Sequence, residues 1–128
     1  MNQTAIKILT GAGSLILLAT AYFHFTGLTP VREIARTVEN DFMQHALITV
    51  WAMLSFHMIF IALLAFGASF YRSQACAAIL MAFGVWNIVD GLIILTHVQF
   101  FPGVPMLIAA GALYLVAGLM LRKLARSG

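Results

Sequence analysis

Long apolar segments separated by short polar ones make up the pattern of this chain. Four segments long enough to cross a bilayer as helices cover residues 8–28, 42–70, 75–97 and 106–121. Short connections at residues 71–74 and 98–105 join the last three, and the second of these carries two prolines and a glycine. The pattern predicts an all-α integral membrane protein, a single domain over residues 1–128 with four transmembrane helices in an up-down-up-down bundle.

The longest polar stretch, residues 29–41, lies between the first two segments. Thr29 is suited to cap a helix and Pro30 to occupy its first position. After them, charged residues occupy one face of the expected helix. The opposite face carries apolar residues at helical spacing, namely Val31, Ile34, Ala35 and Val38. We expect a short amphipathic helix in the membrane interface. A polar linker with a chance periodicity is the alternative.

Composition supports the membrane assignment. Hydrophobic residues make up 62% of the chain and charged residues only 9%, too few to cover a soluble domain of this size. Cys76 is the only cysteine, which excludes an internal disulfide, a paired-thiol redox site and a thiolate metal cluster. The positive charges sit at the ends of the apolar segments and form no patch for nucleic acid.

The distribution of lysine and arginine predicts the orientation. One side of the predicted bundle carries five such residues and the other carries two, Arg32 and Arg36. The positive-inside rule then places both termini in the cytoplasm and the amphipathic segment outside. We expect a protein of the bacterial plasma (inner) membrane. Its expected partners are the lipid bilayer and either further copies of the chain or other membrane subunits.

Small residues predict which helix faces meet. On the third segment they recur every seven positions, at Ala77, Gly84 and Gly91. The fourth segment repeats this spacing twice, from Ala110 to Ala117 and from Gly111 to Gly118. Seams of this kind allow helices to pack closely. Asn87 lies on the same seam and should face protein, whereas Asp90 should border the bundle interior or a water-filled cleft.

Asp90 is the only acidic residue inside an apolar segment. A carboxylate at that depth is costly and is usually kept where it faces protein or water. By position along the helices, Asp90, Asn87 and His57 lie near the middle of the bundle, with Ser14 and Tyr114 at similar depth. These five residues predict a pocket for a polar ligand or for proton handling, since histidine titrates near neutral pH. An interhelical hydrogen-bond network with a structural role is the alternative.

A second polar group is predicted at the outer face. His24, His45 and His97 come from three different segments, and Glu39 and Asp41 lie just beyond them. Imidazoles and carboxylates at one level could ligate a transition metal, or two imidazoles could hold a haem. Histidines also favour membrane interfaces for their amphipathic rings, so this group has a plain explanation as well.

Three functions are compatible with these features. The first is a small non-enzymatic binding or accessory protein with a polar intramembrane pocket, working as a subunit of a larger membrane complex. The second is an oligomeric transporter of a small molecule, proton or cation that uses Asp90. The third is a redox or enzyme subunit that binds haem, metal or quinone at its outer histidines. We favour the first, because no motif of a known reaction is present in the sequence.

Overall fold

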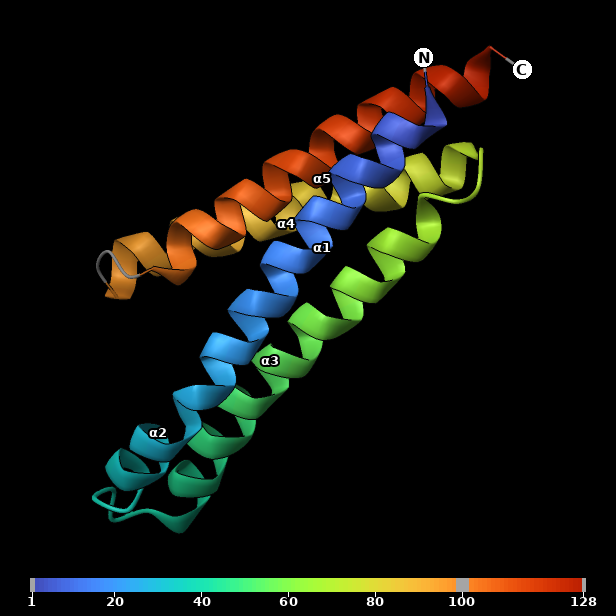
Figure 1. Ribbon diagram of the computed structural model, residues 1–128. Coiled ribbons are helices and arrows are strands. Elements are labelled where there is room, and N and C mark those ends of the chain that lie inside the picture. The colour runs from blue at the N-terminus through green and yellow to red at the C-terminus, as the bar shows by residue number, and fades with distance from the viewer. Residues whose placement is uncertain (1, 99–101, 128) are drawn as a thin grey trace.

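The computed structural model describes residues 2–98 and 102–127, and this part of the chain is helical without a strand (Figure 1). Its helices are α1 (Gln3–Thr26), α2 (Leu28–Ala35), α3 (Asp41–Ala68), α4 (Gln74–Val98) and α5 (Gly103–Arg126). Four stretches of these residues are long and apolar enough to cross a membrane, with α1 and α2 together forming the first. The predicted helical class and the four long apolar helices are therefore confirmed.

Helices α1 and α3 begin at polar capping residues just outside the apolar segments. The Asn2 side chain accepts a hydrogen bond from the Thr4 amide (2.9 Å), and Asn40 accepts one from Met43 (3.1 Å). Such side chains satisfy the free amides of a first helical turn. Helix α5 starts at Gly103, so Pro105 lies in its first turn instead of in a connecting loop. The remainder of the predicted connection, residues 99–101, lies outside the described residues.

The amphipathic segment is shorter than predicted, because α2 ends at Ala35 and residues 36–40 form a turn. It also begins earlier, at Leu28, without a side-chain cap from Thr29. Its N-cap, Gly27, has helical dihedral angles (φ −73°, ψ −7°), so α2 continues α1 after a bend. Pro30 accounts for the break, since its ring nitrogen cannot donate the next helical hydrogen bond.

Trp51 of α3 holds this bend. Its indole Nε1 donates a hydrogen bond to the carbonyl oxygen of His24 (2.8 Å). The backbone amide of Gly27 donates to the same oxygen (3.1 Å). A Cβ atom on Gly27 would lie 2.7 Å from the Trp51 ring. The bend therefore needs glycine at this position, because only glycine leaves room for the indole.

Helices α4 and α5 form the closest helix pair, along the predicted small-residue seams. A Cβ on Gly84 would lie 2.8 Å from the Gly111 carbonyl oxygen, and one on Gly118 would lie 3.0 Å from that of Ala77. The two backbones therefore approach each other directly, as small residues permit in membrane helices. The seam prediction is confirmed.

Helix α1 packs against α5 on one side and against α3 on the other, whereas α3 and α4 share far less contact. Figure 1 shows α3 and α4 diverging from the turn that joins them, so that the molecule opens between the α1–α3 pair and the α4–α5 pair. The short connection between α3 and α4 therefore does not make them a closely packed pair. A short turn fixes only where two helices start, and their side chains decide whether they stay together.

Candidate functional site

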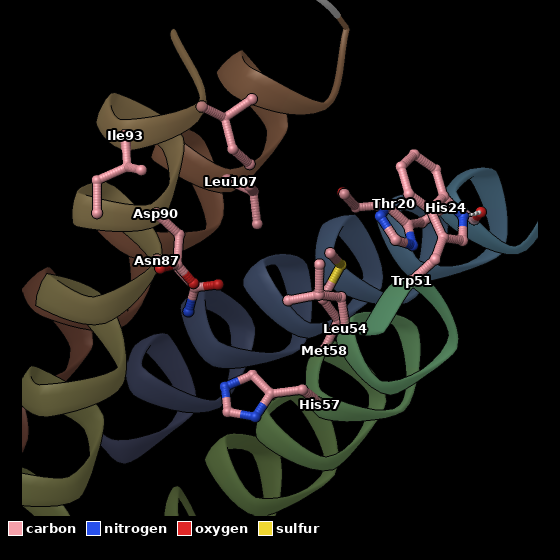
Figure 2. A pocket seen from close by; sticks show the side chains of 11 residues that line it. Thr20, His24, Trp51, Leu54, His57, Met58, Asn87, Asp90, Ile93 and Leu107 are labelled. Carbon is pink, nitrogen blue, oxygen red and sulfur yellow. Dashed lines mark hydrogen bonds between the residues drawn. The ribbon is translucent and has the colours of Figure 1, made fainter. Parts of the chain in front are cut away.

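The space between the two helix pairs holds a cavity of about 350 Å³ (Figure 2). Its walls come from all four long helices and are mostly apolar. The lining residues are Thr20, His24, Trp51, Leu54, His57, Met58, Asn87, Asp90, Ile93, Ile94 and Leu107. A mostly apolar cavity with a few convergent polar groups is the usual form of a small-molecule site.

Two polar side chains of α4 point into this cavity. Asn87 is buried, and its Nδ2 donates to the Phe83 carbonyl oxygen one turn earlier (2.8 Å). This bond holds the amide nitrogen against α4, and Figure 2 shows the amide oxygen turned toward the space between the helices. Asp90 is half-buried beside it. The α4 wall therefore presents oxygen atoms to the cavity.

His24 and Trp51 form the opposite end. Their rings stack with centroids 4.0 Å apart and an angle of 14° between the planes. The Nδ1 atom of His24 also shares a hydrogen bond with the buried Ser55 hydroxyl (2.8 Å). With the indole bound to the His24 carbonyl oxygen as well, this aromatic end is held in one arrangement and forms a rigid wall for an apolar or aromatic group.

Asp90 lies where the cavity meets the outer surface of the bundle. Asp90 also lines two shallow outer grooves, one between α3 and α4 and one on α4. Among the described residues, it alone lines both grooves and the inner cavity. His57 and Trp86 face each other at the same place, with ring centroids 5.6 Å apart. The cavity is thus open sideways between α3 and α4, with Asp90 at its mouth.

The structure brings together three of the five residues predicted for the pocket. His57, Asn87 and Asp90 line the cavity. Ser14 and Tyr114 do not line it, since both are buried where α1 meets α5 and bond to each other (3.0 Å). Their depth along the helices matches that of the pocket, but they point into the helix contact. The alternative interpretation, an interhelical hydrogen-bond network with a structural role, therefore describes these two residues.

The outer group of histidines and carboxylates is not brought together. His24 is bound to Ser55, whereas His45, His97, Glu39 and Asp41 are exposed. Within residues 2–98 and 102–127, no three His, Cys, Asp or Glu side chains lie close enough to hold one metal ion. The residues present therefore do not fit a shared metal centre at this face.

Sequence reasoning did not place Thr20, His24 or Trp51 in the pocket. Thr20 and His24 are four residues apart on α1 and so share one helix face, a signal that was present in the sequence. No comparable signal marks Trp51, because its role depends on the bend at Gly27, which brings the indole over the end of α1.

Comparison of the chain with models of protein families, with curated proteins and with solved structures gives no match.

Proposed function

We propose that this chain is a small integral membrane protein that binds a mostly apolar molecule with a polar end in the cavity between its two helix pairs. It crosses the bilayer four times, up-down-up-down, with both termini in the cytoplasm. It acts as a binding or accessory protein of the membrane. The observation that carries this proposal is the cavity itself, in which His57, Asn87 and Asp90 face apolar walls.

Burial of polar groups supports a ligand role for this cavity. Polar side chains within membrane helices are costly unless they pair with protein groups or line a cavity. Ser14, Tyr114, Thr10 and Ser55 are paired in the helix contacts. Asp90 instead lines the cavity and both outer grooves. An open mouth toward the lipid suits a molecule that dissolves in the bilayer and reaches the site from there.

Titration with aminoanthracene tests this function, since this neutral aromatic probe fluoresces more strongly in apolar cavities. The protein is purified in dodecyl maltoside, and Leu54→Trp fills the cavity from α3. We expect this variant to bind the probe about tenfold or more weakly than the wild type, a change of about 1.4 kcal/mol or more.

Leu63→Trp provides the matched control, because Leu63 is an exposed residue of the same helix and lines none of the cavities described above. We expect it to bind the probe like the wild type. If the wild type and Leu54→Trp take up the probe equally, the cavity is not a binding site and the proposal is wrong.

A further inference from the structure

Several polar side chains of the cavity wall offer hydrogen-bond acceptors to a ligand. Thr20 donates its hydroxyl hydrogen to the Ile16 carbonyl oxygen (2.8 Å), and Asn87 donates to Phe83 (2.8 Å). The hydroxyl oxygen of Thr20 can still accept a hydrogen bond, and the amide oxygen of Asn87 is turned toward the space between the helices. Asp90 adds a carboxyl group to this set. A ligand is therefore bound best by a polar end that donates hydrogen bonds.

The charged residues around the cavity also favour a ligand that donates hydrogen bonds. No lysine or arginine is among the described residues that line the cavity or its outer grooves. The basic side chain that faces Asp90 is His57, across the gap between α3 and α4. A carboxylate in apolar surroundings gains most from a cation, because charge-assisted hydrogen bonds are stronger than neutral ones.

An aromatic side chain lies beside Asp90 at the mouth of the cavity. Trp86 lines both outer grooves with Asp90, one turn away from it on α4. Its ring also lies against His57, with ring centroids 5.6 Å apart. A positively charged group at the mouth can thus contact the Asp90 carboxylate and the Asn87 oxygen, while an apolar body extends toward Trp51 and His24.

We infer that the ligand of this cavity is a protonated organic amine on an apolar body, with Asp90 as its counter-ion. The inference rests on the proposed binding function and names the class of molecule bound. Amines of this kind partition into bilayers with the charge near the headgroups, and they reach the cavity sideways through the gap between α3 and α4.

Two probes of one shape test the inference. Naphthylmethylamine is protonated at neutral pH, whereas naphthylmethanol carries the same ring and no charge. Each is used to displace aminoanthracene from the wild-type protein in dodecyl maltoside, an uncharged detergent that does not concentrate the amine. We expect the amine to displace the probe at about one tenth of the alcohol concentration or less, a difference typical of one charged contact.

Asp90→Asn and Asp90→Ser remove the charge in two ways, so that one poorly folding variant does not decide the test. We expect both to lose the preference for the amine, so that amine and alcohol displace the probe at similar concentrations. Glu39→Gln, which removes an exposed carboxylate at the end of the molecule, should keep the preference.

The possible failures are distinct. Equal displacement by amine and alcohol in the wild type overturns the assignment of an amine, while the cavity remains a binding site. A preference that survives in the Asp90 variants overturns the role of Asp90. If the wild type does not bind aminoanthracene at all, the proposed function fails with it.

Discussion

Ser14 connects three helices through one hydroxyl group. It donates to the Ala62 carbonyl oxygen of α3 (2.8 Å) and shares a second hydrogen bond with the Tyr114 hydroxyl of α5 (3.0 Å). Both side chains are buried. Since Ser14 gives its hydrogen to Ala62, the Tyr114 hydroxyl is the donor in the second bond. The pair therefore stabilises the contact of α1 with both of its neighbours.

Tyr114→Phe should lower stability slightly, because it removes one buried hydrogen bond and keeps the shape of the ring. We expect a loss of about 0.5–1.5 kcal/mol in the free energy of unfolding, the range of hydrogen bonds between membrane helices. Unfolding with rising SDS fraction in mixed micelles measures it. Tyr71→Phe, at an exposed position, should unfold like the wild type. Equal stability of the two variants would show that the Ser14–Tyr114 bond contributes nothing.

At the scale of single residues, the sequence predicts depth better than direction. Asn87 could be placed toward protein because it lies on a seam of glycines, and it is buried. Tyr114 lies between Gly111 and Gly118 in the same way, so the sequence also marks it as facing a neighbouring helix. Ser14 has no such marker, and its position along the helix put it beside Asp90. Their true partners depend on how α1 is rotated about its axis, which nearly uniform apolar surroundings do not reveal.

At the scale of elements, the α4–α5 contact follows from the sequence and the bend between α1 and α2 does not. Glycines repeating every seven residues mark a close helix contact on both partners at once. Pro30 marks a break in the helix, but the bend also depends on Trp51, a distant residue whose ring fills the space beside Gly27. A tryptophan in an apolar segment gives no sign of which backbone it will contact.

Gly84→Ala tests the α4–α5 seam. An added Cβ would lie 2.7 Å from the Leu115 amide nitrogen and 2.8 Å from the Gly111 carbonyl oxygen. Both are backbone atoms, so the helices must move apart, and we expect a loss of about 1–3 kcal/mol in the free energy of unfolding. The same SDS titration measures it.

Gly67→Ala is the matched control, because a Cβ on Gly67 of α3 has no neighbour within 4 Å. We expect this change to alter the free energy of unfolding by no more than about 0.5 kcal/mol. A Gly84→Ala protein as stable as Gly67→Ala would mean that the two helices are not in close contact at Gly84.

At the scale of the whole molecule, the opening between the two helix pairs gives the protein its cavity. Apolar periodicity predicts that four long helices form, but it does not say which pairs pack closely. Helix α1 has contacts with both α3 and α5, and α3 meets α4 mainly through their connection and across the cavity mouth. The candidate site therefore depends on an arrangement that no single segment encodes.

The same arrangement concentrates positive charge at one end. Figure 1 shows both termini and the α3–α4 turn at this end. The lysines and arginines near these points are Lys7, Arg72, Arg122, Lys123 and Arg126, against Arg32 and Arg36 at the opposite end. Positively charged loops are retained in the cytoplasm during insertion, so this end should be cytoplasmic.

Cysteine labelling tests this orientation in a Cys76→Ser background, which removes the only native thiol. Thr37→Cys reports on the turn between α2 and α3, and Ser127→Cys reports on the C-terminal end, since both positions are exposed. In intact cells, a membrane-impermeant maleimide should label the first variant and not the second. After lysis it should label both, which shows that each thiol is reactive. Labelling of Ser127→Cys in intact cells with protection of Thr37→Cys would invert the topology, and the mouth of the cavity would then lie nearer the cytoplasmic side of the bilayer.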